Sequence, residues 1–265
     1  MPELPEVETI ARKLKPELVN RTILSADLRW TRTLATPSPG KFKEQIQGQR
    51  IVDIGRRAKY LIFRLSSYSL LIHLRMSGDL YIKDRTLSAA KHDRLIINVS
   101  GGRSVAFNDT RKFGRVWLTS DPADILGKLG PEPLDNEFTS QWLYAALHKR
   151  HRQLKPLLLD QTFIAGLGNI YTDETLNIAK LHPQRDSSSV TAKQAEALRD
   201  AIQNVLQEGI RRNGATIDWV YRGGEFQNYF RVYDREGYPC QNCGAIIKRM
   251  VVGQRGTHYC PNCQR

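Results

Sequence analysis

Cysteine is missing from the first 239 residues of this 265-residue chain, and all four cysteines lie between residues 240 and 263. A disulfide scaffold or a cysteine nucleophile is therefore excluded from most of the sequence. Long apolar segments are missing as well, since no run approaches the ~20 residues of a membrane-spanning helix. The N-terminus lacks the basic-then-apolar layout of a signal peptide, so we expect a cytoplasmic protein without a membrane partner.

Acidic residues are scarce, with 27 Asp and Glu against 40 Lys and Arg, for a formal net charge of +13. This excess favours a polyanionic partner, with nucleic acid ahead of a membrane surface. The sequence is 40% hydrophobic, which is enough for buried cores. Its length fits two domains, or one domain with a small appendage.

The first nine residues, Met-Pro-Glu-Leu-Pro-Glu-Val-Glu-Thr, carry the most distinctive chemistry. Removal of Met1 would leave Pro2 as a free secondary amine, and roughly a tenth of such termini are neutral and nucleophilic at pH 7. An amine that attacks a sugar aldehyde forms a cationic iminium, which is an electron sink. Glu3 is the adjacent carboxylate, close enough to transfer protons. The alternative is an ordinary helix start without chemistry.

Apolar residues spaced i, i+3, i+4 and i+7 from Val7 predict a helix over residues 5–15, which Pro16 would end. The pattern then changes to short strands, which at this spacing suggest an antiparallel sandwich or barrel. The stretch 31–40 is predicted to be a loop. The predicted strands are 22–30, 51–55, 58–65, 69–75, 79–83, 94–99, 103–108 and 114–119.

Several basic or unusual side chains lie in this β region. Lys59 enters a strand and points either at a site or into water, and water is the better interpretation of a lone lysine. Met76, Arg111 and Phe113 lie on loops, where each taken singly would be expected to pack on the core. Together they resemble the wedges that DNA-binding proteins insert into a base stack.

Gly130-Pro-Glu-Pro133 is the predicted domain boundary, and helical spacing follows it. Helices are predicted after Thr139 or Ser140, over 154–160, over 170–180, and from the capping box Thr191–Gln194 to about Ile210. Gly166-Leu-Gly168-Asn169 lacks the third glycine of a dinucleotide fingerprint, so that interpretation is rejected. It is either a phosphate-binding helix start or a tight turn between helices.

Cys240-x2-Cys243 and Cys260-x2-Cys263 form two knuckles separated by sixteen residues. Four thiolates complete a tetrahedral Zn²⁺ site with no open position, so the metal would be structural. The alternative is an iron site of rubredoxin type. Arg255 lies at the predicted hairpin tip, where it would reach DNA. Many zinc ribbons bind protein instead, which keeps a non-enzymatic interpretation open.

Taken together, these pieces resemble the formamidopyrimidine-DNA glycosylase family, bacterial enzymes that excise oxidised purines. The resemblance runs nearly end to end, and its ordered motifs are highly specific. They are Pro2-Glu-Leu-Pro-Glu-Val-Glu-Thr9, Arg57-Ala-Lys59-Tyr60, His73-Leu-Arg-Met76-Ser-Gly78, Lys91-His92-Asp93, Asp109-Thr-Arg111-Lys-Phe113-Gly114, Leu129-Gly-Pro-Glu-Pro133, Gly166-Leu-Gly-Asn169-Ile-Tyr171 and the cysteine ribbon.

The resemblance implies an α+β multidomain protein with DNA in the cleft between its domains. The expected parts are an N-terminal antiparallel β-sandwich with a leading helix (1–130), a helix–two-turn–helix domain (131–235) and a C-terminal β-hairpin zinc finger (236–265). It also implies base excision followed by AP lyase cleavage through β,δ-elimination. The expected partner is double-stranded DNA with oxidised bases or abasic sites. One structural Zn²⁺, no catalytic cofactor and a monomer are expected.

Carried over position by position, the resemblance makes Pro2 the nucleophile and Glu3 the key acid, with Lys59 and Arg255 also catalytic. Met76, Arg111 and Phe113 match the residues that fill the gap left by the everted base, with Arg111 facing the orphaned cytosine. Phosphate contacts fall on Lys155, Asn169 and Arg255, with His73 and His92 as lesser candidates. Zinc falls on Cys240, Cys243, Cys260 and Cys263.

Two positions depart from the family pattern. Arg75 stands where glycine is frequent, and residues 217–228 show little pattern where the family closes over the everted base. The nearest rival resembles endonuclease VIII, which removes oxidised pyrimidines, although Leu4 and the Met76, Arg111 and Phe113 set favour the purine branch. The rival from another class is a catalytically silent zinc-ribbon DNA-binding protein.

Overall fold

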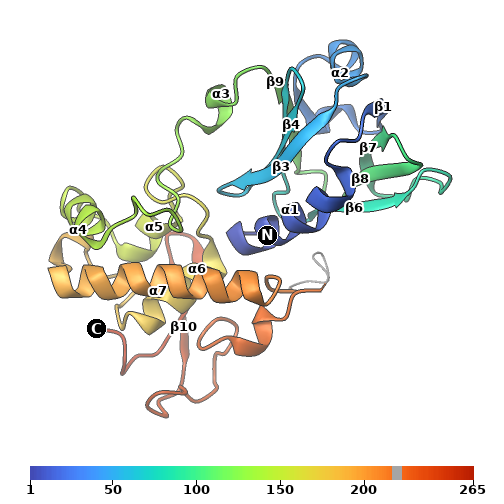
Figure 1. The fold of residues 1–265 in the computed structure, drawn as a ribbon. Coiled ribbons are helices and arrows are strands. Elements are labelled where there is room, and N and C mark those ends of the chain that lie inside the picture. Colours follow the sequence, from blue (N-terminus) through green and yellow to red (C-terminus); the bar gives the residue numbers. More distant parts are fainter. Residues whose placement is uncertain (217–222) are drawn as a thin grey trace. The chain divides into compact units, whose positions relative to one another are not determined.

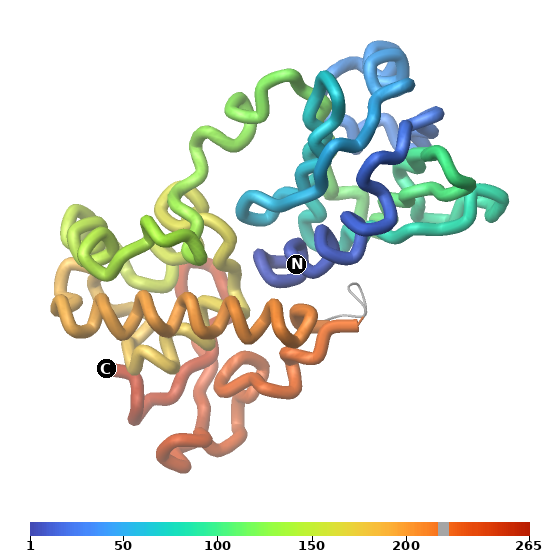
Figure 2. The backbone as a smooth tube through the Cα atoms, in the orientation of Figure 1, coloured from blue at the N-terminus to red at the C-terminus, as the bar shows by residue number. Residues whose placement is uncertain are grey.

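The computed structural model describes residues 1–216 and 223–265. The chain divides into two compact units, the first comprising Met1–Gly127 and Ala215–Gly224 and the second Lys128–Gly214 and Glu225–Arg265. The first unit therefore combines two separate stretches of sequence, and Figure 2 colours the backbone by residue number. None of the described helices has the length and apolar character needed to cross a membrane.

Two β-sheets form the first unit (Figure 1), one in the order β1-β7-β8-β6 and one in the order β2-β9-β5-β4-β3. All neighbouring strands are antiparallel except β2 and β9, which are parallel. The strands are β1 (Ile23–Leu28), β2 (Leu34–Thr36), β3 (Ile51–Arg57), β4 (Tyr60–Leu65), β5 (Ser69–His73), β6 (Gly78–Asp84), β7 (Asp93–Val99), β8 (Arg103–Asp109) and β9 (Arg115–Thr119).

Side chains from both sheets share one hydrophobic core, to which Leu70 and Phe63 contribute from one sheet and Ile97 and Phe107 from the other. Burying side chains of this size contributes roughly 1.5–3 kcal/mol each. Because two separate sheets enclose the core, the sandwich predicted from the strand spacing is confirmed and the barrel alternative is wrong. A short helix, α3 (Ala123–Leu126), follows the last strand.

The leading helix, α1 (Leu4–Leu18), packs its apolar face into the same core through Val7, Ile10 and Leu14. The helix was predicted to end before Pro16, but it continues to Leu18. Pro16 removes one backbone donor, and the burial of Leu18 in the core compensates for that loss.

The predicted loop over 31–40 is wrong in part. It contains a 3₁₀ turn, η1 (Thr31–Thr33), the strand β2, and the first residues of the helix α2 (Pro39–Ile46). Pro39 in the first helical turn is a start signal that could have been recognised. By contrast, β2 exists because it pairs with β9, which lies about eighty residues away in the chain, so no local pattern encodes it.

Helices dominate the second unit, and the long α7 packs against α4 and α6. Thr139 caps α4 by accepting the N–H of Trp142, and Thr191 with Gln194 forms the predicted capping box of α7. Both caps were expected from the sequence. The elements are α4 (Ser140–His148), α5 (Leu154–Leu159), α6 (Asn169–Ile178), η2 (Ser187–Ser189), α7 (Ala192–Arg211) and η3 (Phe226–Tyr229).

A β-hairpin, β10 (Lys248–Val252) and β11 (Arg255–Tyr259), completes the second unit. Val252 pairs with Arg255 across a two-residue turn, so Arg255 directly follows the tip. Val232 and Ile247 pack with cysteines of both knuckles in a small separate core. The predicted three-part architecture of sandwich, helices and cysteine hairpin is confirmed.

Candidate active site

Glu3 is the N-cap of α1 and forms a reciprocal capping box with Glu6. The Glu3 side chain accepts the backbone N–H of Glu6, and the Glu3 N–H donates to Glu6 Oε2 over 2.7 Å. Glu3 is 2% exposed, and Pro2 is also buried. The box therefore fixes the Glu3 carboxylate one residue after Pro2, whose nitrogen would become a free amine on removal of Met1.

Glu6 has a second connection that sequence reasoning missed. Its Oε1 accepts the backbone N–H of Ala215 over 2.8 Å, and its side chain is buried. Ala215 begins the segment that returns to the first unit. Of the segment 217–228, which shows little pattern in the sequence, residues 217–222 lie outside the described part of the chain. The signal for Glu6 was present in the Glu-x-x-Glu spacing of a capping box.

Lys59 lies in the tight turn between β3 and β4, after Ala58, whose φ is 52°. The lysine side chain is 5% exposed, so the interpretation of Lys59 as a solvated surface lysine is wrong. His73, at the end of β5, is also buried, and the positive charge of Lys59 contributes to lowering its pKa. The structure thus gathers Lys59 and His73 in one part of the first unit.

His73 is neutral at physiological pH. Burial, together with the nearby cations Arg75 and Lys59, lowers the pKa of His73 to about 3. The backbone N–H of Arg75 donates to His73 Nδ1 over 3.0 Å, which assigns the remaining proton to Nε2. A contact from His73 to phosphate would therefore be a neutral N–H hydrogen bond and not an ion pair.

This pKa shift predicts a pH-dependent stability. Between pH 6.5 and 3 the unfolded chain binds a proton at His73 that the folded chain does not, so stability falls as pH falls. Each pH unit in this window costs up to about 1.4 kcal/mol. Urea denaturation at pH 7 and pH 5 should show that wild type loses about 2 kcal/mol more than His73→Gln. His151→Gln, at an exposed histidine, is the control; equal losses in wild type and His73→Gln would contradict the assignment.

Met76 and Phe113 project from their loops, at 42% and 49% exposure, and do not pack on the core. The expectation that each taken singly folds back is therefore wrong for both residues. The Arg111 guanidinium lies 4.9 Å from the centre of the Phe113 ring, within cation–π range. Large apolar side chains exposed beside a cation suit insertion into a base stack.

The loops adopt left-handed backbone at Arg75, with φ 54°, and at Lys112, with φ 61°. This region favours glycine, and a side chain there costs roughly 1–2 kcal/mol. The geometry explains why glycine suits position 75, where the sequence departs from the family pattern. His92, on the adjoining strand end, has its Nδ1 3.2 Å from Arg94 Nη2.

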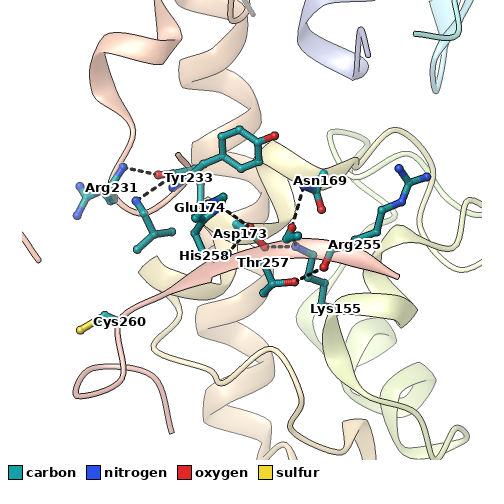
Figure 3. A network of polar contacts seen from close by, with 12 residues as sticks. Lys155, Asn169, Asp173, Glu174, Arg231, Tyr233, Arg255, Thr257, His258 and Cys260 are labelled. Atoms are coloured by element: carbon teal, nitrogen blue, oxygen red, sulfur yellow. Dashed lines mark hydrogen bonds and ion pairs between the residues drawn. The ribbon is translucent and has the colours of Figure 1, made fainter. Parts of the chain in front are cut away.

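In the second unit, Lys155 and Asn169 converge on one backbone carbonyl of the hairpin (Figure 3). Lys155 Nζ donates to Gly256 O over 2.9 Å, and Asn169 Nδ2 donates to the same oxygen over 3.1 Å. Lys155 Nζ also lies 2.6 Å from Asp173 Oδ1, with both side chains fully buried. Lys155 therefore supports the hairpin from inside and does not present its ammonium to solvent.

Asp173 also holds the hairpin, because its Oδ2 accepts the backbone N–H of His258 over 2.9 Å. In the hairpin register Gly256 and His258 face away from β10, so their backbone groups are the free edge of β11. Side chains from α5 and α6 satisfy that edge. Arg255 is exposed, and Figure 3 shows its side chain extending away from the Lys155–Asp173 pair.

Glu174, next to Asp173 on α6, was not singled out from the sequence. Its carboxylate accepts three successive backbone N–H groups, from Arg231, Val232 and Tyr233, at 2.8–3.0 Å. Burial raises the pKa of Glu174, while the three amide donors oppose that rise. Asp173 and Glu174 are neighbours on α6. Asp173 holds the edge of the hairpin, and Glu174 holds residues 231–233, which lead to it.

The four cysteine sulfurs all lie within 4.8 Å of one another. Zn–S bonds of about 2.3 Å in a tetrahedron require sulfurs about 3.8 Å apart. The Cys240–Cys263 and Cys243–Cys260 sulfurs are 3.9 and 3.5 Å apart, which fits that requirement. Four thiolates leave no open coordination position, so the site suits a structural zinc ion, as predicted.

Family models match three successive parts of the chain. They are the formamidopyrimidine-DNA glycosylase N-terminal domain over residues 1–116, the H2TH domain of the same enzymes over 129–220, and a zinc finger found in FPG and IleRS over 237–265.

This chain is similar to known relatives and solved structures over nearly their whole length. A formamidopyrimidine-DNA glycosylase of Chloroflexus aurantiacus is 46% identical over 272 residues, covering 100% of this chain and 98% of the relative. One of Pelotomaculum thermopropionicum is 43% identical over 276 residues, covering 100% and 99%. The solved structure of Lactococcus lactis Fpg with abasic-site DNA matches with a TM-score of 0.94 at 36% identity, covering both chains completely.

Together with the fold and the cysteine site, these matches define a multidomain enzyme of DNA repair with a structural zinc finger. The chain belongs to the formamidopyrimidine-DNA glycosylase family. It is a glycosylase and AP lyase of base-excision repair that acts on oxidised purines, as the sequence resemblance predicted.

Proposed function

We propose that the chain excises 8-oxoguanine and formamidopyrimidines from duplex DNA with Pro2 as nucleophile and Glu3 as its proton-transfer partner. The observation that supports this proposal is the capping box, which fixes the buried Glu3 carboxylate one residue after Pro2 at the start of α1. Solved complexes of the Lactococcus lactis relative are described with abasic-site DNA and with N7-benzyl-Fapy-dG DNA. We infer the same substrate class for this chain.

The proposed reaction begins with attack of the Pro2 lone pair on the sugar C1′. The bond from C1′ to the base breaks, and its electron pair leaves with the base. Glu3 takes the proton that the Pro2 nitrogen loses and passes it to the ring oxygen, which opens the sugar and forms the iminium. The iminium acidifies C2′, so that loss of a proton expels the 3′ phosphate and a second elimination expels the 5′ phosphate. Lys59 is proposed to position the lesion and its backbone, and Arg255, whose guanidinium stays protonated, to bind the phosphate beside the lesion.

A base inside a duplex cannot be attacked at its sugar carbon, so the nucleotide must be extruded at a cost of a few kcal/mol, roughly. We propose that Met76, Arg111 and Phe113 fill the gap, with Arg111 facing the orphaned cytosine. Their exposure and the cation–π contact support this role.

Contacts to the flanking phosphates are proposed for Asn169, Arg255 and His92, with His73 as a neutral donor. The phosphate role predicted for Lys155 is proposed to be indirect. Its ammonium is fully buried against Asp173 and Gly256, so it would set the hairpin from which Arg255 projects.

We further propose that the protein acts as a monomer in the cytoplasm, in association with the nucleoid. Functional modules are proposed at 1–130, 131–235 and 236–265. The family-model limits and the division of the chain at Lys128 support the first boundary. Residues 215–224 fall within the proposed middle module but are grouped with the first unit, so that module is not one continuous stretch.

A single-turnover assay tests the substrate class. Duplexes carrying 8-oxoguanine or a formamidopyrimidine opposite cytosine should be cleaved faster than a matched thymine glycol duplex. Preferential cleavage of thymine glycol would assign the chain to the pyrimidine branch. Tight, salt-dependent binding without any cleavage would instead indicate a silent DNA-binding protein.

A further inference from the structure

A fully buried carboxylate lies between the two loops that carry the proposed wedge residues. Asp109 is the last residue of β8, and in the sheet register it pairs with Gly78, the first residue of β6. Met76 lies two residues before Gly78, and Arg111 and Phe113 follow Asp109 closely. No role in the reaction proposed above requires Asp109 itself.

One oxygen of Asp109 joins the two loops. Asp109 Oδ1 accepts a hydrogen bond from the Ser77 hydroxyl and a second from the backbone N–H of Arg111, over 3.2 Å. The same Arg111 N–H also donates to Ser77 Oγ over 3.1 Å. The residue after Met76 and the backbone of Arg111 are therefore tied to a single carboxylate oxygen.

The other oxygen closes the second loop on itself. Asp109 Oδ2 accepts the backbone N–H of Gly114 over 2.7 Å. The Asp109 carboxylate thus accepts the N–H groups of Arg111 and Gly114, near the two ends of the loop 110–113. Lys112, between them, has left-handed backbone. Backbone donors bonded to a buried carboxylate are stronger than neutral pairs, so this loop is held in one geometry.

Backbone groups of Asp109 extend the network to His92. The Asp109 N–H donates to His92 O over 2.9 Å, and Arg94 Nε donates to Asp109 O over 2.7 Å. Arg94 is in turn the residue that approaches the His92 ring. Four residues proposed to contact DNA, on three separate chain segments, are thus linked through Asp109.

Two glycines allow the loops to come this close. A Cβ at Gly78 would lie 2.8 Å from Phe107 Cε2 and 2.5 Å from Leu74 O. At Gly114 a Cβ would lie 2.3 Å from Phe107 Cζ and 3.1 Å from Asp109 Oδ2. Both loops therefore pack their backbones on the same buried ring, beneath the carboxylate.

We propose that Asp109 is a positioning residue that sets Met76, Arg111 and Phe113 in one fixed arrangement, so that base extrusion depends on this carboxylate. The inference rests on the wedge role of those three residues in the proposed function. Asp109 acts through them and touches neither the base nor the sugar. Cleavage of DNA at a preformed abasic site, which has no base to extrude, should depend on Asp109 much less.

Asp109→Asn is the discriminating substitution. An amide that keeps its oxygen toward Ser77 and Arg111 turns its NH₂ toward the Gly114 N–H, where two donors oppose each other. The side chain keeps its size, but the 110–113 loop loses one anchor. Ser77→Ala is the milder companion, since it removes one donor to Oδ1 and one acceptor of the Arg111 N–H but leaves both backbone bonds to Asp109 in place.

The experiment compares two single-turnover rates of the full-length protein: excision of 8-oxoguanine opposite cytosine, and cleavage of the same duplex with a preformed abasic site. Asp109→Asn should slow excision by about 10- to 100-fold, the range for hydrogen bonds to a charged group. Abasic cleavage should fall by about threefold or less, because no base has to be extruded. Ser77→Ala should show the same imbalance to a smaller degree.

A double-mutant cycle with Phe113→Ala adds a readout that general destabilisation does not move. If Asp109 acts through the loop, Asp109→Asn should slow excision less in the Phe113→Ala background than in wild type. Ile97→Ala, which removes core volume from β7 without touching either loop, is the stability control and should slow both reactions alike.

The outcomes separate the two proposals. Failure of wild type to excise 8-oxoguanine would refute the proposed function. An active wild type with equal slowing of excision and abasic cleavage in Asp109→Asn, or with fully additive effects in the cycle, would overturn the positioning role. If Asp109→Asn does not fold, the same two criteria apply to Ser77→Ala.

Discussion

Glu3→Gln is expected to lower the rate of base excision by about 100- to 10,000-fold, the range that a positioned general acid or base contributes. The amide oxygen can still accept the Glu6 N–H, so the capping box and α1 should survive. What is lost is the proton that Glu3 delivers to the sugar ring. DNA affinity should change little, because Glu3 makes no proposed contact to phosphate.

The measurement is single-turnover excision of 8-oxoguanine beside the equilibrium Kd for the same duplex. Glu17→Gln, an exposed carboxylate near the other end of α1, is the matched control and should react like wild type. An excision rate within about threefold of wild type in Glu3→Gln would show that another group transfers the proton.

Loss of the zinc ion is expected to weaken DNA binding by about 100-fold or more. Structural zinc contributes roughly 10–16 kcal/mol to the folding of such elements, so the hairpin should not persist without it. Arg255 and the edge held by Lys155, Asn169 and Asp173 would then lose their geometry. The loss of two hydrogen bonds to DNA phosphates, at about 1.5 kcal/mol each, accounts for a 100-fold change in affinity.

The first unit contains no cysteine, so its β-sandwich should keep its circular dichroism while DNA binding is lost. The test titrates a chelator while following released zinc, DNA affinity and the β signal together, and then restores zinc. Recovery of binding on zinc addition is the control for irreversible damage. Undiminished affinity after complete metal loss would exclude the hairpin as a DNA contact.

Features of the fold that depend on residues close together in the sequence were predictable. The apolar spacing from Val7 marks α1, Thr191 and Gln194 mark α7, and the paired cysteines mark the zinc hairpin. The strand β2 was missed because its stability comes from pairing with β9, a partner distant in the chain. The continuation of α1 past Pro16 was missed because tertiary burial of Leu18 outweighs the local proline signal.

The same distinction holds for the site. Pro2 and Glu3 stand out because their chemistry follows from their place at the N-terminus. Asp109 and Glu174 do not, because a sequence shows an acidic residue but not the backbone donors that it accepts. The burial of Lys155 was equally invisible, since the hairpin carbonyl that it meets lies 101 residues further along the chain.

The most direct test of the account is a borohydride trap on a duplex with one 8-oxoguanine opposite cytosine, with the adduct located by mass spectrometry. If Pro2 is the nucleophile, a covalent adduct forms at Pro2 in protein that has lost Met1, and none forms in protein that retains it. Excision without any adduct, or an adduct on a lysine, would contradict Pro2 as the nucleophile.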